Sequence, residues 1–195
     1  GITLPSGPTE MRGGRGRGVS NGSHPSTVTL QMIEIGTTGN AVDFGDMFDG
    51  GYGAGAAGNS TIGVSAGGYS LQKVIGYFVF SSGGGQNEFG DLQQNQWLPF
   101  GVSNNIRAVF GGAYYKVDYN APFEVNGFSD FIQFATKGES SNFGLRVPTY
   151  GSASINSSTR GIYAGGVQRY PGTTGGGSPL YDNQDAVTYM RKIEI

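Results

Sequence analysis

The chain has 195 residues, of which 37 are glycine and 8 are proline, and only 13% are charged, with a formal net charge of −2. Glycine and proline occur at about twice their usual combined share, which excludes a helical bundle. Cysteine is absent, which excludes disulfide frameworks, thiolate zinc sites and cysteine nucleophiles. A weakly charged surface rich in Gly, Ser, Thr, Asn and Tyr suits carbohydrate or another protein better than nucleic acid.

The length fits a single domain spanning residues 1–195. No apolar run approaches the roughly 18 residues that cross a bilayer, so we expect no membrane insertion. Residues 1–8 have neither the basic nor the apolar region of a signal peptide. Because the chain lacks an initiating Met, we expect it to be processed or excised.

The first predicted elements lie within residues 1–44. Residues 1–4 (Gly-Ile-Thr-Leu) and 17–22 (Arg-Gly-Val-Ser-Asn-Gly) have the pattern of short strands, and Ile33 and Ile35 alternate with polar residues in the same way. Residues 38–40 then form a turn, because their glycine adopts positive φ at little steric cost.

Residues 45–89 repeat these elements in the same order. Gly45-Asp46 follows Phe44, and residues 53–57 (Gly-Ala-Gly-Ala-Ala) are too short and too small for a helix, so they predict a weak strand. Further strands are predicted at 62–68 and around Phe78 and Phe80, and a turn at 82–85.

The pattern recurs twice more, in residues 90–143 and 144–195. Gly90 and Gly144 follow a phenylalanine, as Gly45 does. The remaining predicted strands, and one turn at 137–139, follow in order: 98–102, 107–112, Ile132 with Phe134, 152–155, 160–166, and Ile193 with Ile195. The glycine pairs at the strand ends indicate that neighbouring backbones approach closely.

Units of about 45 residues with four strands each are typical of propeller blades. We therefore predict an all-β fold, a four-bladed β-propeller with repeat units at about 1–44, 45–89, 90–143 and 144–195. Residues 1–4 would supply the strand that the last unit lacks, so that the N-terminal strand closes the ring and removes exposed sheet edges. An open stack of the same sheets is the alternative.

Two sets of residues carry a resemblance to a known family. Residues 109–112 and 162–166 resemble the double-glycine element of kelch repeats. Together with residues 33–46, the segment 158–166 looks like the kelch-like repeats of virion proteins from tailed phages of aquatic bacteria, and the likeness spans nearly the whole chain. The resemblance implies a tail-fibre or other exterior virion component for assembly or host attachment, with other virion subunits as partners and a trimer as one arrangement.

Two insertions lie at the same place in adjacent units. One lies between the strand at 107–112 and Ile132 in unit three, and the other between the strand at 160–166 and Ile193 in unit four. Such insertions in repeat proteins often build a binding face. Tyrosine offers an apolar ring and a hydroxyl, and amides and carboxylates bond sugar hydroxyls or a partner's backbone. The candidate ligand-binding residues are Tyr114, Tyr115, Asp118, Tyr119, Gln168, Arg169, Tyr170, Tyr181 and Asp182. The alternative is that these rings only cover the loops or pack on a neighbouring subunit.

Several other charged residues have both a functional and a structural interpretation. Asp43, Asp46, Glu88 and Asp91 recur near one turn and could bind calcium, but turn caps are the favoured interpretation. With the glycines between them, Arg12, Arg15 and Arg17 have the pattern of an Arg-Gly-Gly segment that binds nucleic acid. Because Arg17 recurs as Arg107 and Arg160, we expect a structural role such as bonding loop carbonyls, and no nucleic-acid binding.

We expect a non-enzymatic structural and adhesion module that binds a partner subunit or a host-surface glycan, with no cofactor and no metal. The alternative is a glycan depolymerase, which needs paired carboxylates, with Asp118, Glu124, Asp182 and Asp185 as its candidates. His24, the single histidine, indicates no catalytic triad. Trp97 occupies the repeat position of Tyr52, and we expect it to pack rather than to recognise a ligand.

Overall fold

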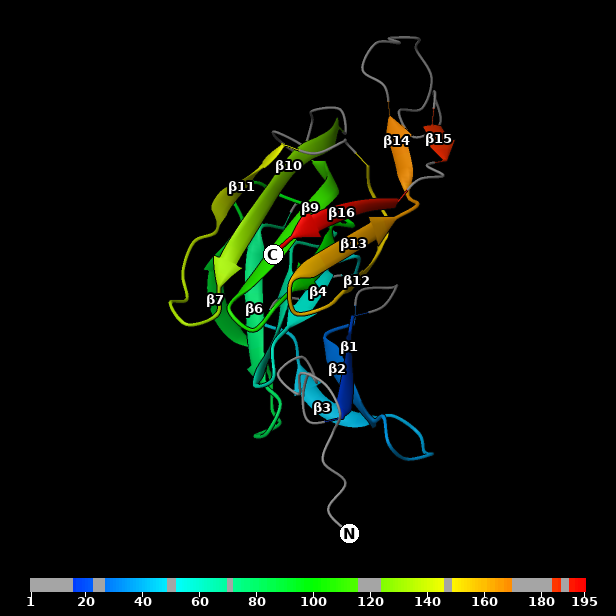
Figure 1. Ribbon diagram of the computed structural model, residues 1–195. Helices are drawn as coiled ribbons and strands as arrows, with labels where there is room; N and C mark the ends of the chain where they lie inside the picture. Colours follow the sequence, from blue (N-terminus) through cyan, green and yellow to red (C-terminus); the bar gives the residue numbers. More distant parts are fainter. Residues whose placement is uncertain are drawn as a thin grey trace.

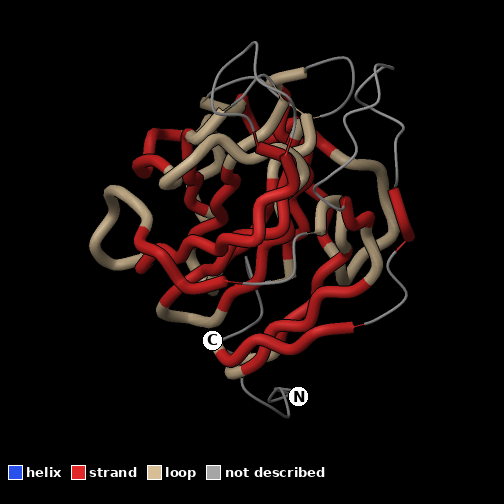
Figure 2. The backbone as a smooth tube through the Cα atoms, turned by 90° about the horizontal axis from the view of Figure 1, so that it is seen from above, coloured by secondary structure: helices blue, strands red, loops and turns tan. Residues whose placement is uncertain are grey.

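The structure is a computed structural model that describes residues 16–22, 27–48, 52–69, 72–115, 124–145, 149–169, 184–186 and 190–195. All regular structure in this part of the chain is β-strand (Figure 1), which confirms the all-β class. Seen from above in Figure 2, the described residues form strands joined by loops and turns. No helix that could span a membrane is found among them.

The strands form antiparallel sheets, each built from strands that are close in sequence. The first sheet contains β1 (Arg17–Asn21), β2 (Thr29–Glu34) and β3 (Val42–Asp46), in that order. The second contains β4 (Gly55–Gly58), β5 (Ile62–Ala66), β6 (Val74–Val79) and β7 (Asn87–Asp91). The predicted weak strand at 53–57 forms as β4, and residues 38–40 and 82–85 lie in connections between strands, as predicted. The turns themselves are at 35–37 and 80–82, and Gly39 does not have the positive φ that we expected of it.

The third sheet contains β8 (Phe100–Ser103), β9 (Arg107–Tyr115), β10 (Glu124–Gln133) and β11 (Ser141–Leu145). The fourth contains β12 (Ala153–Asn156), β13 (Arg160–Ala164) and β16 (Met190–Glu194). A separate hairpin of β14 (Val167–Arg169) and β15 (Gln184–Ala186) lies between β13 and β16 in sequence. The insertion in unit three lengthens the β9–β10 hairpin, and that in unit four contains the β14–β15 hairpin.

The repeat units of the sequence and the sheets of the structure are out of phase. The strand that contains each Phe-Gly pair hydrogen-bonds to the strand before it, with Gly45 opposite Leu30, Gly90 opposite Ile75 and Gly144 opposite Ser129. A register shift follows each of these pairings. The Phe-Gly strand is therefore the last strand of one sheet, although it opens a unit of the sequence repeat.

The sheets lie around a shared space. The first strands β4, β8 and β12 of successive sheets lie side by side. A cavity of about 310 Å³ is lined from all four sheets, with Asn21, Ala57, Ser103 and Asn156 among its residues. This arrangement is propeller-like. Residues 1–4, which we predicted to close the ring, lie outside the described residues.

Three apolar clusters hold successive sheets together. Phe44 of the first sheet packs edge-on against Phe78 of the second, with ring centroids 5.4 Å apart. The second and third sheets share a larger cluster around Val64, Phe110 and Ile132. Val109 of the third sheet joins Ile193 of the fourth in the last cluster. Burying apolar side chains of this size stabilises the fold by about 1.5–3 kcal/mol each.

Candidate functional site

A row of aromatic side chains crosses the second, third and fourth sheets at one end of their strands. It is anchored by one backbone contact that recurs three times, always between residues 17 apart. The bonds are Tyr69 N–H to Tyr52 C=O at 2.8 Å, Tyr114 N–H to Trp97 C=O at 2.9 Å, and Val167 N–H to Tyr150 C=O at 3.0 Å. The repeat thus places an aromatic residue at an equivalent point of each of the three sheets.

The rings of this aromatic row touch in sequence. Tyr52 stacks on Tyr69 with centroids 4.7 Å apart, and Tyr69 meets Trp97 edge-on at 5.3 Å. Trp97 stacks on Tyr114 at 5.4 Å, and Tyr114 lies against Tyr150 at 3.6 Å. Aromatic pairs at these separations contribute about 0.5–1.5 kcal/mol beyond area burial. The aromatic row is therefore a rigid unit rather than a set of independent side chains.

The two ends of the aromatic row differ in exposure. Tyr114 and Tyr150 are buried, whereas Tyr69 is 41% exposed. The pKa of the Tyr52 hydroxyl is raised above its ordinary value, first by desolvation and then by the adjacent Tyr69. The Tyr52 hydroxyl therefore stays neutral and can donate a hydrogen bond at physiological pH.

Backbone geometry beneath the row is also repeated. Gly53, Leu98 and Gly151 occupy equivalent positions and all have positive φ, of 75°, 59° and 66°. Leu98 N–H donates to Gly53 C=O at 2.8 Å, and Gly151 N–H donates to Leu98 C=O at 3.2 Å. These bonds run from sheet to sheet and fix the spacing of the rings. A Cβ on Gly53 would lie 2.6 Å from Trp97 Nε1, so glycine is needed for the indole to fit.

Only part of the predicted ligand-binding set can be placed. Tyr114 is in the aromatic row, although it is buried rather than offered to solvent. Gln168 pairs with Asp185 in the β14–β15 hairpin. The backbone of Tyr115 pairs with Glu124, and that of Arg169 with Gln184. The other predicted residues lie outside the described part: Asp118, Tyr119, Tyr170, Tyr181 and Asp182.

The described strands that flank the two insertions are neighbours. The far end of the β9–β10 hairpin and the β14–β15 hairpin lie at the same end of the molecule (Figure 1), and β10 contacts β14. Tyr114 is near the end of β9, and Tyr150 is bridged to Val167 of β14. The Tyr114–Tyr150 end of the aromatic row therefore lies at the base of both insertions.

Sequence reasoning missed three members of the row, Tyr52, Tyr69 and Tyr150, as functional candidates. The signal that could have found them is the spacing of 17 residues, since Tyr52–Tyr69 and Trp97–Tyr114 are both aromatic pairs at that separation. The expectation that Trp97 packs is confirmed, because its indole contacts Tyr52, Tyr69 and Tyr114.

The structural roles predicted for the charged residues are confirmed for some of them. The turn-cap interpretation is confirmed for Asp43, whose Oδ1 accepts from Gly45 N–H at 2.9 Å. No group of three side chains suited to a metal ion occurs among the described residues. The carbonyl-bonding role is confirmed for Arg17, which donates to Phe80 C=O at 2.5 Å. Arg107 instead lies over the Phe143 ring, at 5.6 Å from its centroid. Arg12, Arg15 and His24 lie outside the described residues.

The comparisons with known proteins bear on the fold. No protein-family model and no curated protein matches the chain. A solved structure titled "Structure of YjhT" superposes with a TM-score of 0.64 at 13% sequence identity. The match covers 86% of this chain and 49% of that chain, so this chain spans about half the length of that neighbour. At this identity the likeness shows the fold, an all-β, propeller-like arrangement of antiparallel sheets.

Proposed function

We propose that the protein is a non-enzymatic structural and adhesion module of a phage virion appendage or tail fibre. It binds another virion subunit or a host-surface glycan at the virion exterior. The sequence resemblance to kelch-like virion repeats supports the proposed location in a virion. The aromatic row is the observation that supports the binding role, because its buried end lies at the base of the two insertions and its other end exposes the Tyr69 ring.

The chemistry of the row suits a sugar or a polar protein surface. The exposed Tyr69 ring presents an apolar face, against which the C–H face of a sugar ring packs, and its hydroxyl and that of Tyr52 supply hydrogen bonds. The buried end, Tyr114 and Tyr150, holds the exposed end in place. Little side-chain entropy is then lost when a ligand binds.

For the architecture of the module we propose a propeller of kelch-like repeats, with the four sheets as its blades. Its support is the shared cavity, the side-by-side strands β4, β8 and β12, and the repeated contacts between successive sheets. Closure of a four-bladed ring by residues 1–4 within one chain stays a prediction. A glycan depolymerase would use Asp118, Glu124, Asp182 and Asp185. The structure describes only the backbone of Glu124 and Asp185, and Asp118 and Asp182 lie outside the described residues.

The binding role is tested with Tyr69→Ala against Phe128→Ala. Both side chains are 41% exposed, but Phe128 lies on β10 opposite Leu145 of β11, outside the aromatic row. Trp97 is the only tryptophan, so its emission reports ligands at the row. We expect host-surface polysaccharide or purified virion subunits to bind the unmodified chain and the Phe128 variant alike, and the Tyr69 variant at least about ten-fold more weakly. No binding to either partner, or equal binding by both variants, contradicts the proposal.

A second experiment separates the two kinds of partner. Shortening residues 116–123 in the phage removes most of one insertion and keeps Tyr114, which stacks on Trp97. If the row serves assembly, virions form with the appendage missing, and if it serves attachment, complete virions form but adsorb poorly to the host. Normal assembly together with normal adsorption contradicts both versions.

A further inference from the structure

Each of the four main sheets has two faces, which turn toward different neighbours along the series. We call the face turned toward the preceding sheet the leading face, and the face turned toward the following sheet the trailing face. Cross-strand partners share a face, and successive residues of a strand alternate between faces. In repeat order, the central leading positions are Ile33, Phe78, Ile132 and Ile193, and the central trailing positions are Val19, Val64, Val109 and Ile162.

The same two positions meet at each of the three junctions within the chain. Val19 packs in one apolar cluster with Phe78, Val64 with Ile132, and Val109 with Ile193. Val64, Ile132, Val109 and Ile193 are all at most 2% exposed. A trailing apolar residue of one sheet and a leading apolar residue of the next therefore define how two sheets of this protein pack.

A fourth pair of the same kind is left open. Ile162, on the trailing face of the fourth sheet, is 36% exposed, and Ile33, on the leading face of the first, is 47% exposed. Neighbours on these faces are also exposed, Ile155 and Met190 on the fourth sheet and Ile35 on the first. The leading position equivalent to Ile35 is buried as Phe134 in the third sheet and as Ile195 in the fourth. Each end of the series of four sheets thus exposes apolar side chains at positions that are covered at the inner junctions. One difference is Lys192 of the fourth sheet, which stands where the first three sheets have Met32, Tyr77 and Phe131.

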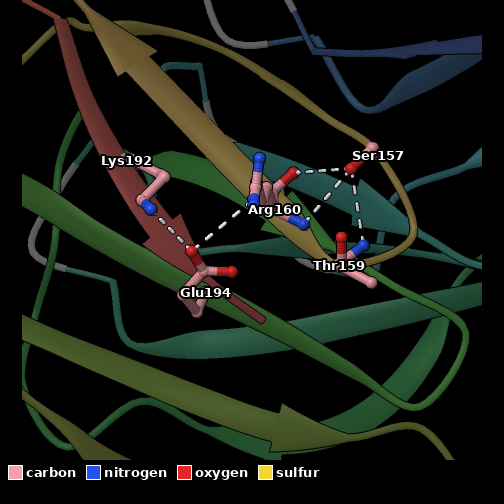
Figure 3. A network of polar contacts seen from close by, with 5 residues as sticks. All are labelled: Ser157, Thr159, Arg160, Lys192 and Glu194. Atoms are coloured by element: carbon pink, nitrogen blue, oxygen red, sulfur yellow. Dashed lines mark hydrogen bonds and ion pairs between the residues drawn. The ribbon is translucent and has the colours of Figure 1, made fainter.

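A polar contact accompanies this packing in the first sheet. Arg17 Nε lies 2.9 Å from Glu34 Oε1 on the trailing face, and Arg17 Nη1 crosses to the Phe80 carbonyl of the second sheet. The fourth sheet carries the equivalent pair, Arg160 and Glu194, at 3.6 Å (Figure 3). The Arg17 and Glu34 side chains are 34% and 45% exposed, whereas those of Arg160 and Glu194 are 63% and 61% exposed.

The hairpin that precedes Arg160 fixes this arginine in position. Ser157 Oγ accepts a hydrogen bond from Arg160 N–H at 3.3 Å, and Lys192 Nζ lies 2.8 Å from Glu194 Oε1 (Figure 3). Glu194 therefore holds two cations on the trailing face. The fourth sheet repeats the arrangement with which the first sheet engages its neighbour, and no following sheet covers it in the described part of the chain.

We propose that the trailing face of the fourth sheet binds the leading face of the first sheet of a second copy of this chain. Ile162 then packs on the second copy's Ile33, and Arg160 donates to the second copy's Ile35 carbonyl, the position equivalent to Phe80. The contact repeats the packing of the three inner junctions, and it is the alternative to closure of a four-bladed ring within one chain. It goes beyond the proposed function, because it does not depend on what the aromatic row binds.

One observation favours a second copy over contact within one chain. The two faces belong to the same chain, yet they stay exposed in its described part. Two copies supply two trailing and two leading faces, which form two identical junctions with twofold symmetry and leave no face open.

The first test is the mass of the purified chain in solution. Light scattering is expected to give twice the chain mass of 20.4 kDa, or a higher multiple, at micromolar concentration. Ile162→Asp and Ile33→Asp are each expected to raise the dissociation constant at least about ten-fold, because a carboxylate is desolvated at the junction. Ile106→Asp is the matched control, since Ile106 lies in the β8–β9 loop off both faces and is as exposed as Ile35, at 67%. A monomer, or equal effects of all three substitutions, overturns the proposal.

The second test uses the absence of native cysteine. Chains carrying Ile33→Cys and chains carrying Ile162→Cys, with different tags, are mixed and treated with a short bismaleimide. We expect a cross-linked heterodimer, and little product when Ile106→Cys replaces either partner. When one chain carries both Ile33→Cys and Ile162→Cys, an internally cross-linked monomer shows that the faces meet within one chain and overturns the proposal. Absence of any cross-link also overturns it. Neither test involves a glycan or a virion, so this inference and the proposed function fail separately.

Discussion

The side chains of Gln86 and Asp130 accept hydrogen bonds from equivalent backbone N–H groups, although they stand at different positions of the repeat. Gln86 Oε1 accepts from Phe48 N–H at 3.3 Å, and Asp130 Oδ2 accepts from Gln93 N–H at 3.3 Å. Phe48 and Gln93 are each three residues past the glycine of a Phe-Gly pair. Two adjacent sheets therefore satisfy one recurring donor in two different ways.

Glycine at position 76 explains the difference. Position 76 in the second sheet corresponds to Asp130 in the third, and position 86 corresponds to Ser140. A Cβ at Gly76 would collide with the amide of Gln86, so a long acceptor at position 86 requires glycine at position 76. In the third sheet the acceptor comes from position 130, and the small Ser140 leaves it room.

The first prediction concerns replacing residues 76 and 86 of the second sheet with their equivalents from the third sheet. Gln86→Ser leaves the Phe48 N–H without its acceptor and removes the 2.8 Å bond from Gln86 Nε2 to Ser65 Oγ, at a cost of about 1–2 kcal/mol. Adding Gly76→Asp copies the third sheet and is expected to recover part of that loss. Gly76→Asp alone is destabilising because Gln86 still fills the space. Urea unfolding of the four proteins measures the coupling, and simple additivity contradicts the shared-acceptor interpretation.

The pH dependence of stability is the second prediction. Burial raises the pKa of the Asp130 carboxyl from 3.8 to about 6, against the opposing hydrogen bonds from Gln93 N–H and Gln96 Nε2. The folded chain thus binds this proton more tightly than the unfolded chain. The contribution of Asp130 to the free energy of unfolding is therefore fully present below pH 3.8 and is lost as the pH rises to about 6.

Asp130→Asn removes that titration while keeping an acceptor oxygen for Gln93 N–H. The added amide N–H can donate to Gln96 Oε1, which is buried without a hydrogen-bond partner in the described structure. The variant is expected to gain stability relative to the unmodified chain as the pH rises from about 4 to about 6. Denaturant midpoints at a series of pH values measure the gain. Parallel profiles for the two proteins would show that Asp130 titrates normally.

Sequence periodicity predicted the strands well because alternation and glycine turns are local properties. The strand around Phe78 and Phe80 and the weak strand at 53–57 both form, within a residue or two of the expected ends. Glycine at position 67 does allow a close approach, because a Cβ there would collide with the Gln96 carbonyl. What the pattern could not give was the partner of the Phe44-Gly45 strand, since a repeat fixes the order of strands but not where one sheet ends and the next begins.

The candidate site was predicted less completely, for a related reason. Tyr114 was found because it borders an insertion, whereas Tyr52 and Tyr69 lie in units without one. Their contact depends on a bridge between strand ends that are 17 residues apart, and on packing across sheets. Contacts between sheets follow from three-dimensional arrangement, which local periodicity does not encode.

The glycines of the Phe-Gly pairs provide the third prediction. Gly45, Gly90 and Gly144 all have positive φ, of 136°, 154° and 126°. A Cβ on Gly45 would collide with the backbone of Gly84 in the next sheet, and one on Gly90 with the backbone of Gly138, whereas one on Gly144 meets no described atom within 4 Å. The close approach serves the bonds from Gly84 N–H to Phe44 C=O and from Gly138 N–H to Phe89 C=O, both 2.8 Å.

Alanine at these positions separates conformational strain from lost sheet packing. Gly144→Ala carries the backbone strain alone, about 1–3 kcal/mol. Gly45→Ala and Gly90→Ala carry the same strain and also push two sheets apart, so they are expected to be distinctly more destabilising. Thermal unfolding of the three variants ranks them. Equal losses would show that the contacts between sheets contribute little.

The aromatic row provides the last prediction, with Trp97 as its probe. Tyr114→Ala removes the ring stacked on the indole at 5.4 Å and is expected to cost about 3–5 kcal/mol while shifting Trp97 emission to longer wavelength, because water then reaches the indole. Tyr163→Ala is the matched control, since Tyr163 is also buried and stacks on Phe100 at 4.5 Å in the cluster between the third and fourth sheets. It is expected to lower stability similarly but to leave the emission of the folded chain unchanged. A red shift in both variants would mean that the aromatic row is not an independent rigid unit. A shift confined to the Tyr114 variant supports the role of the row as the fixed base of the binding face.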